Sequence, residues 1–327
     1  MRKLFKILEA SRIFSLPMSI FSWLIIFVYS LNNSGKILYG LAALVGICLV
    51  HLAANLADDL IDYKYLIKKV DFDKEEYLKN SQKTKCRYII SGFFKESELL
   101  HIIFTYLGLA FIIGFILFLK CGTGVLYYMI AGGFLSLIYP LFSRICLSEV
   151  TIALVYGPIL FGGVYYVMCG GYSSEVFILS IPSTVMTVVL LYIHTVMDYE
   201  FDLNEGKKTL ANLFDSQLDS LIVLKVLLIS AYVSLVFLCI FDILDWQVFL
   251  TCVTIPLAID LYNSLSVYSC NSEEIPRKKW YHYPMENYDR LEENCELSFM
   301  MRMYQSRNLM MYFSLFLTLG IILSLAI

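Results

Sequence analysis

Four residues with oxygen-bearing side chains lie close together at the end of a long apolar run. They are Asn55, Asp58, Asp59 and Asp62. Positions i, i+3, i+4 and i+7 lie on one face of an α-helix, so these side chains are predicted to form a single stripe of oxygen ligands. Three acids at this spacing require a cation or a hydrogen-bond donor nearby. For Asp58 alone, a solvated interfacial position is an equally good interpretation.

A second acidic cluster ends a later apolar run. Asp198 and Asp202 are again four residues apart, and His194 precedes them by one helical turn. Two lysines, Lys207 and Lys208, follow just after a glycine. His194 fits a substrate contact and equally well a buried histidine bonded to a neighbouring helix. Both clusters are predicted at helix ends on the same side of a membrane, where they can face each other at similar depth.

Two opposed carboxylate stripes with basic residues nearby are typical of a magnesium diphosphate site. Magnesium prefers oxygen ligands, and proteins usually hold it with one or two carboxylates while water and substrate phosphate complete its shell. Lysine and arginine then neutralise the remaining phosphate charge. Arg87 is a candidate for this role, because Ser91-Gly92 behind it predicts a tight turn whose amides can approach a phosphate. The predicted ligand is a diphosphate whose other part is apolar enough to lie in the membrane.

The elements that carry these residues are predicted to be transmembrane helices. Of the 327 residues, 59% are hydrophobic and 16% are charged, and the mean hydropathy is +0.70, which excludes an ordinary soluble enzyme. The net charge of −3 provides no basic field that would attract nucleic acid, so no nucleic-acid partner is expected. The expected surroundings of the protein are the lipid bilayer. Long continuous apolar runs favour helices over a β-barrel.

Windows of about 19 residues predict nine membrane spans. No linker separates soluble domains, so residues 1–327 are expected to form a single transmembrane domain of the all-α class. The predicted spans are Leu16–Leu31, Ile37–Leu60, Leu99–Leu119, Gly124–Phe142, Val150–Met168, Phe177–Met197, Leu221–Phe241, Val248–Val267 and Leu309–Ile327.

The basic residues predict the orientation of the chain. Most of them, including the cluster from Lys64 to Lys95, fall on the side of the acidic clusters, and only Lys36 and Lys120 fall in loops on the other side. By the positive-inside rule the N-terminus and the site are expected on the cytoplasmic face of the cell membrane. The connection 268–308 lies on the same side and fits either a lid over a cavity or an interfacial anchor.

These motifs resemble, in order along the chain, those of the UbiA superfamily of intramembrane aromatic prenyltransferases. The likeness is closest to the branch that prenylates 1,4-dihydroxy-2-naphthoate. Residues 12–17 look like its opening RPxxLP, residues 55–62 like its NLANDxxD, and residues 198–211 like its DxxxDxxxGKRTLA. Arg87 falls where that branch has a basic residue before Ser-Gly, and further matches occur between residues 139 and 166.

The resemblance implies a fold, a reaction and roles for the candidate residues. The fold is nine transmembrane helices around a central cavity. The reaction is Mg²⁺-dependent transfer of a polyprenyl group from an allylic polyprenyl diphosphate to an aromatic quinone precursor, as in menaquinone biosynthesis. The residues implied to bind magnesium diphosphate, and hence to be catalytic, are Asp59, Asp62, Asp198 and Asp202. Those implied to neutralise the leaving pyrophosphate are Arg87, Lys207 and Lys208, with Asn55 and Asp58 as neighbours in the first motif.

The sequence also departs from that branch. Asp58 stands where the branch usually has Asn, and His194-Thr195 stands where an Asn pair precedes the second motif. These departures are compatible with prenyl transfer and leave the identity of the aromatic acceptor open.

Two other functions fit parts of the sequence. Asp58-Asp59-Leu-Ile-Asp62 is the DDxxD pattern of polyprenyl diphosphate synthases, although that class is soluble and this chain is strongly apolar. Intramembrane carboxylates also serve transporters, where they tend to lie near the bilayer midplane among broken helices. Here the acids fall at helix ends beside lysines, which favours the transferase.

Overall fold

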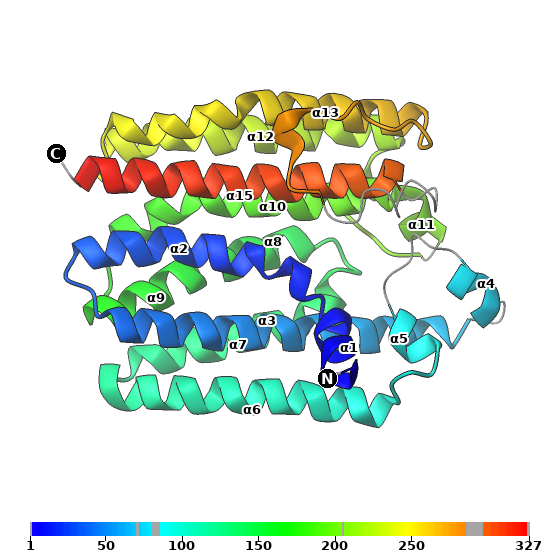
Figure 1. The fold of residues 1–327 in the computed structure, drawn as a ribbon, viewed down its shortest axis with the longest axis horizontal. Coiled ribbons are helices and arrows are strands. Elements are labelled where there is room, and N and C mark those ends of the chain that lie inside the picture. Colours follow the sequence, from blue (N-terminus) through cyan, green and yellow to red (C-terminus); the bar gives the residue numbers. More distant parts are fainter. Residues whose placement is uncertain (1, 70–71, 80–85, 205, 286–296, 326–327) are drawn as a thin grey trace.

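The computed structural model describes residues 2–69, 72–79, 86–204, 206–285 and 297–325. In this part of the chain nine helical segments are long and apolar enough to cross a membrane. They run side by side along the long axis of the molecule (Figure 1). The prediction of an all-α integral membrane protein with nine transmembrane helices is confirmed.

The spans are formed by long helices, and three of the spans include a 3₁₀- or π-helical stretch. They are η1 with α2 (Ile13–Ser15 and Pro17–Asn32), α3 (Ile37–Leu66), α6 (Glu96–Cys121), α7 (Gly124–Phe142), α8, η2 and α9 (Ser148–Leu154, Val155–Ile159 and Leu160–Cys169), α10 (Ser174–Met197), α12 (Gln217–Ile240), η4 with α13 (Trp246–Thr254 and Ile255–Cys270) and α15 (Leu297–Leu325). The shorter elements are α1 (Arg2–Ala10), α4 (Lys74–Lys79), α5 (Arg87–Ile90), α11 (Tyr199–Asn204), η3 (Ala211–Leu213) and η5 (Trp280–His282).

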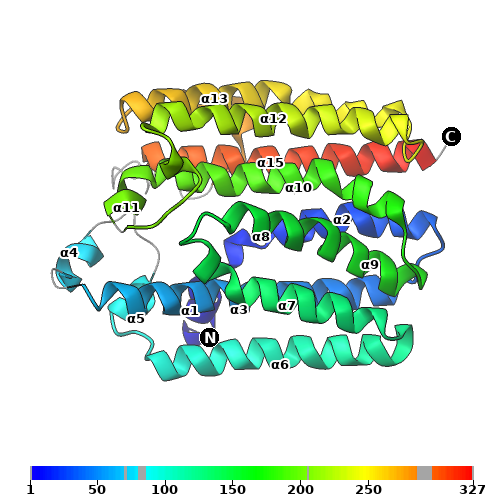
Figure 2. The same ribbon diagram turned by 180° about the vertical axis from the view of Figure 1, so that it is seen from behind.

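The long helices form two groups with a smaller group between them. Helices α3, α6 and α7 pack together on one side, and α10, α12, α13 and α15 pack together on the other. Helices α2 and α9 lie between these groups and contact both (Figures 1 and 2). The short helices α1, α4, α5 and α11 gather toward one end of the bundle, and the C-terminus lies at the opposite end. Helix α3, which carries the first acidic cluster, and helix α10, which the second cluster follows, both finish toward the end with the short helices.

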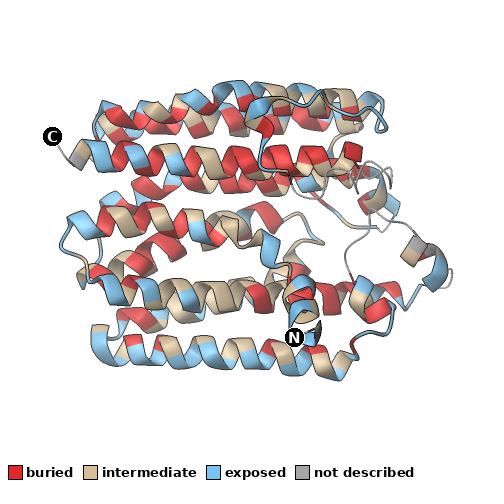
Figure 3. Ribbon diagram, in the orientation of Figure 1, coloured by how far each residue is buried: buried red, intermediate tan, exposed pale blue. Residues whose placement is uncertain are grey.

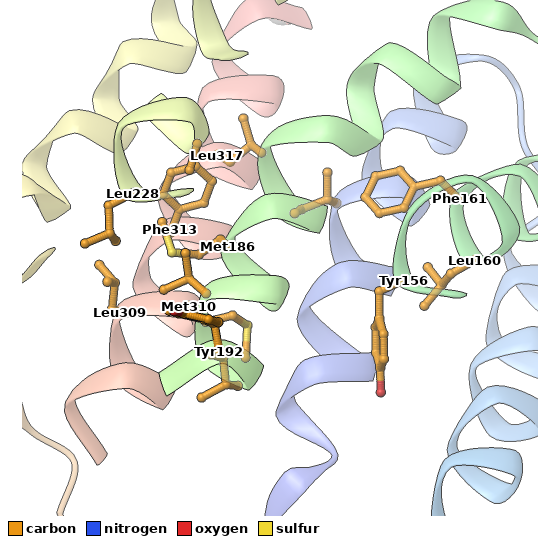
Figure 4. Close-up of a cluster of buried hydrophobic side chains, with 14 of the residues drawn as sticks. Tyr156, Leu160, Phe161, Met186, Tyr192, Leu228, Leu309, Met310, Phe313 and Leu317 are labelled. Atoms are coloured by element: carbon orange, nitrogen blue, oxygen red, sulfur yellow. The ribbon is translucent and has the colours of Figure 1, made fainter. Parts of the chain in front are cut away.

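Burial distinguishes the centre of the bundle from its lipid-facing surface (Figure 3). In α10, 72% of the apolar window is buried, whereas only 22% is buried in α6 and 11% in α7. The exposed side chains of α6 are nevertheless large and apolar, as with Phe104 and Phe111. Lipid tails solvate such side chains as well as a protein core does. Around α10 the core is close-packed, with Met186 and Tyr192 against Phe313 and Leu228 (Figure 4).

The last span begins at Leu297, twelve residues before the predicted Leu309. Hydropathy windows reject the first turns of this helix because they contain Arg302, Gln305 and Asn308. In the structure these polar side chains are buried, and segment 271–285 lies against them. The Arg302 guanidinium donates to the carbonyl oxygens of Ser264 at 2.9 Å and Glu274 at 3.0 Å. The helix therefore starts where its polar groups find partners rather than where the sequence becomes apolar.

The fifth span is interrupted by one turn of π-helix, η2. Pro158 lies within this turn and has no backbone N–H to donate, and Gly157 has non-helical dihedral angles of φ −94° and ψ −109°. A π-turn inserts an extra residue into the helix and changes the direction of the side chains around it. In this span the π-turn changes the direction of the Tyr156 side chain, which lines the cavity described below.

Candidate active site

The acids of the first motif lie on the last turns of α3 and are almost fully buried. Asp58, Asp59 and Asp62 are only 4%, 7% and 5% exposed. Arg12 forms ion pairs with two of them. Its guanidinium lies 3.5 Å from the Asp58 carboxylate and bonds directly to the Asp59 carboxylate. Burial acts to lower the pKa of Arg12, but the two carboxylates outweigh it and raise the pKa above its ordinary value. Arg12 therefore stays charged beside the acids.

The local backbone brings Arg12 to this position. It is the residue that precedes the turn η1, two residues after α1 ends, and its φ of 55° lies in the left-handed region. The chain changes direction there, so α1 leaves the axis of α2 and the Arg12 side chain points toward the end of α3.

The second motif is built from the end of α10 and the short helix α11. Asp198 caps α10, and the Asp202 amide donates to the Asp198 carbonyl oxygen at 2.8 Å. Gly206 then takes a φ of +67°, which allows the Lys207 amide to reach back to the Asp202 carbonyl oxygen at 2.9 Å. This tight return directs the Lys207 side chain toward both motifs.

Lys207 joins the two acidic motifs. Its ammonium nitrogen lies 3.5 Å from the Asp202 carboxylate and 3.7 Å from that of Asp62. Two helices distant in sequence, α3 and α11, thus place carboxylates around one cation. The prediction that the clusters meet at similar depth agrees with this arrangement.

A second cation reaches Asp62 from the loop between α7 and α8. The Arg144 guanidinium lies 3.7 Å from the Asp62 carboxylate and 3.9 Å above the ring of Tyr65. The backbone fixes this loop, because the Lys208 amide donates to the Arg144 carbonyl oxygen at 3.2 Å. Lys208 therefore positions Arg144 through its main chain.

A cavity of about 550 Å³ opens between these elements. Its polar end is lined by Asn55, Asp58, His194, Asp198, Asp202 and Lys207, all predicted from the sequence as candidate site residues. Further in, the walls are apolar and include Ile47, Ile113, Leu117, Val125, Leu160 and Val164. A cavity with an acidic and basic mouth and an apolar interior suits a ligand with a charged head and a hydrocarbon tail.

The other predicted site residues lie outside this lining. Asp59 and Asp62 stand beside it, held by the cations described above. Arg87 is exposed on α5, and the Lys208 side chain is exposed on the loop after α11. Neither lines the cavity in the described part of the chain, so contact of these two side chains with a diphosphate stays a prediction.

The structure also brings in residues to which the sequence analysis gave no role at the site. One is Arg144, whose guanidinium approaches Asp62. Another is His51 on α3, which lines the cavity. For His51 a signal existed, because it lies four residues before Asn55 and continues the same helical stripe. For Arg144 the sequence offers only a basic residue near a helix end. Arg12 entered the sequence analysis only as part of the opening motif.

The donor set fits magnesium bound together with a diphosphate. Among the described residues, no three His, Cys, Asp or Glu side chains are arranged to hold a metal ion by themselves. Magnesium normally takes only one or two carboxylates when phosphate oxygens and water complete its shell. Carboxylates from two helices at the polar end of the cavity, with cations beside them, match that requirement.

Comparison with known proteins agrees with this geometry. Residues 15–283 match the model of the UbiA prenyltransferase family. Comparison with the curated proteins finds no significant match. Among solved structures, one described as digeranylgeranylglyceryl phosphate synthase in membranes has a TM-score of 0.59 at 16% identity, covering 98% of this chain and 99% of that one.

Two further solved structures show the same fold. A UbiA homologue from Aeropyrum pernix K1 has a TM-score of 0.60 at 15% identity, covering 93% of this chain and 97% of that one. A UbiA homologue from Archaeoglobus fulgidus, bound to DMAPP and Mg²⁺, has a TM-score of 0.58 at 12% identity, and the match covers 93% of this chain and 99% of that one. Since the family model covers most of the sequence, the chain belongs to the UbiA prenyltransferase family and is a membrane-embedded prenyltransferase.

Proposed function

We propose that this enzyme transfers a polyprenyl group from an allylic polyprenyl diphosphate to an aromatic quinone-precursor acceptor, with magnesium as cofactor. The observation that carries the proposal is the position of Lys207 between Asp62 and Asp202, at the mouth of a cavity whose interior is apolar. A diphosphate at this mouth would place its hydrocarbon chain against the apolar walls. The solved neighbour bound to DMAPP and Mg²⁺ supports the same assignment by analogy.

The acidic and basic residues have different roles in the release of the diphosphate. The acids of both motifs would hold the magnesium diphosphate, with Asp198 and Asp202 on one side and the acids of α3 on the other. When bound, magnesium neutralises negative charge on the diphosphate. Lys207 and Arg144 hold positive charge in place at the same end of the cavity, so the diphosphate can leave with the electron pair of its bond to the prenyl carbon.

The walls of the cavity protect the carbon that becomes electron-poor. Apolar side chains exclude water, which would otherwise compete with the acceptor for that carbon. The ring of the acceptor then forms the new carbon–carbon bond, and the displaced ring substituent is released, as a proton or, with a naphthoate, as carbon dioxide. We propose 1,4-dihydroxy-2-naphthoate as the first acceptor to test, because the motifs resemble that branch most closely.

The proposed orientation places the site on the cytoplasmic face. Both acidic motifs lie at the end of the bundle where α4 and α5 lie (Figure 1), and these two short helices fall within the basic cluster from Lys64 to Lys95. The positive-inside rule supports this side as cytoplasmic.

The function is tested with purified protein in lipid, magnesium and a panel of polyprenyl diphosphates and acceptors. The panel contains naphthoates and benzoates, and also a glyceryl phosphate, because that class is named for one structural neighbour. We expect a prenylated aromatic product by mass spectrometry with the wild-type enzyme and none with Asp198→Asn. Asp245→Asn, an exposed acid in the loop before η4, is the matched control and keeps wild-type activity. Product from Asp198→Asn at the wild-type rate, or transfer to the glyceryl phosphate alone, would refute the proposal.

A further inference from the structure

The cavity contains a second polar cluster, deeper than the acidic motifs. His51 lies on α3 seven residues before Asp58, which is about 10 Å further along the helix axis. His51, Ser15, Ser19 and Tyr156 all line the cavity. They come from three different spans, and Asn55, which bonds Ser15, links them to the first acidic motif. Polar groups at this depth are costly unless they bind one another or a ligand.

One ring nitrogen of His51 belongs to a fully satisfied set of hydrogen bonds. Ser15 Oγ lies 2.8 Å from His51 Nε2, receives a bond from Asn55 Nδ2 at 3.0 Å, and donates to the Arg12 carbonyl oxygen at 2.8 Å. Since Ser15 has a single hydroxyl proton and gives it to that carbonyl, His51 Nε2 carries the ring proton and donates it to Ser15. Every donor and acceptor site of the Ser15 hydroxyl is then used.

The other ring nitrogen has more hydroxyl neighbours than it can bind. With the proton on Nε2, His51 Nδ1 offers one lone pair. Ser19 Oγ lies 2.7 Å from it and Tyr156 Oη lies 2.9 Å from it. Only one of the two hydroxyl protons can occupy that lone pair, and Ser19 is the closer. The Tyr156 hydroxyl is then left with Ser19 Oγ at 3.4 Å, which is longer than an ordinary O–H···O bond, so its proton can turn to an atom inside the cavity.

The backbone around Tyr156 is built to present this hydroxyl. Tyr156 lies in the π-helical turn η2, and such turns occur often at functional sites. In Figure 4 its ring stands apart from the packed cluster around Phe313, with the oxygen at the end away from Leu160. A tyrosine needed only for packing would not require a hydroxyl directed at a histidine in the cavity.

We propose that Tyr156, whose hydroxyl lies beside His51 and Ser19, binds an oxygen substituent of the acceptor ring. The proposal rests on the function proposed above, because it needs a diphosphate at the acidic motifs and an aromatic acceptor beside its prenyl carbon. The cluster lies inward of the carboxylates on the same stripe of α3, where the ring of an acceptor would meet the first carbons of the prenyl chain. The class of acceptor selected is an aromatic ring that bears a hydroxyl or carbonyl oxygen.

The test measures binding, so it does not depend on turnover. Full-length protein in nanodiscs, with magnesium and inorganic pyrophosphate filling the polar end, is titrated with 4-hydroxy-2-naphthoate and with 2-naphthoate, which lacks the ring oxygen that Tyr156 would bind, and binding to empty nanodiscs is subtracted. We expect the wild-type protein to bind 4-hydroxy-2-naphthoate about fivefold more tightly than 2-naphthoate, the value of one hydrogen bond. In Tyr156→Phe this preference is lost, while the affinity for 2-naphthoate is unchanged.

Tyr232→Phe is the matched control, because the Tyr232 hydroxyl bonds Thr254 at 2.7 Å and neither residue lines the cavity. It keeps the wild-type preference. Retained pyrophosphate binding shows that each variant is folded. If Tyr156→Phe keeps the preference, or the wild-type protein has none, the inference is overturned even when the transfer assay succeeds. If no aromatic acceptor is ever prenylated but the preference depends on Tyr156, the oxygen-binding site stands and the proposed function fails.

Discussion

Replacement of Lys207 by methionine isolates the charge that joins the two acidic motifs. Methionine keeps an apolar stem of similar length, so the change removes the ammonium group and little else. Lys120 is the matched control, because it is exposed in the last turn of α6, at the other end of the bundle, and it does not line the cavity. The pair therefore compares the same substitution inside and outside the site.

The distances give the size of the expected effect. At 3.5 Å from Asp202 and 3.7 Å from Asp62, each contact of Lys207 corresponds to about 4.5 kcal/mol of gross attraction at an effective dielectric constant of about 20. Desolvation of the charges offsets much of this in the free enzyme. In the transition state, however, negative charge grows on the departing diphosphate, and loss of one fixed donor to such a charge lowers kcat by about 100- to 1000-fold.

The assay is release of pyrophosphate in a single turnover, with saturating polyprenyl diphosphate and magnesium. We expect Lys207→Met to slow release by that factor, and Lys120→Met to stay within about twofold of the wild-type rate. Melting temperatures of both variants show whether the bundle is intact. A folded Lys207→Met enzyme with a rate within threefold of wild type would refute the assignment of this lysine to the leaving group.

Three further predictions test other parts of the structure. Gly206→Ala places a side chain at a φ of +67° with open space around it, so we expect only backbone strain, about 1 kcal/mol in unfolding free energy, measured by thermal denaturation. Burial lowers the pKa of His282 in the folded protein below its ordinary value of 6.5. The part of the unfolding free energy that depends on the neutral ring is therefore fully present above pH 6.5, and it is lost as the pH falls through the lower pKa of the folded state. The melting temperature should fall over that range, and His282→Gln should flatten the fall; identical pH profiles would contradict this. Chelation of magnesium should abolish pyrophosphate release and binding of the prenyl diphosphate, with recovery on adding magnesium back, whereas binding unchanged by chelation would contradict the proposed cofactor.

The fold was predictable because the bilayer restricts the choices. Apolar runs of spanning length have to be helices in lipid, so windows over the sequence find α6 or α12 without any knowledge of their neighbours. The same windows miss the start of α15, since Arg302 and Asn308 are tolerated there only through partners from segment 271–285. A local hydropathy rule contains no information about such partners.

The site was predictable where its residues share one helix. Helical spacing alone places Asn55, Asp58 and Asp62 together on α3. It does not reveal that Arg144 approaches Asp62, because that contact depends on a backbone bond between two loops distant in sequence. Tyr156 was equally inaccessible, since a π-turn changes the side-chain direction that regular helical spacing predicts.

The buried polar residues of α15 bear on how the chain enters the membrane. A helix that carries an arginine inserts poorly by itself, at a cost of about 2.5 to 3.5 kcal/mol when the residue lies near the helix centre. Here the Arg302 guanidinium and the Asn308 amide donate to backbone oxygens of the preceding connection, including that of His282 at 2.6 Å. Deletion of residues 271–285 should therefore lower the fraction of molecules whose last helix is inserted, which glycosylation-site mapping of the C-terminus can measure. We therefore expect membrane integration of this helix to be a late step of biogenesis that depends on tertiary folding of the connection 271–285.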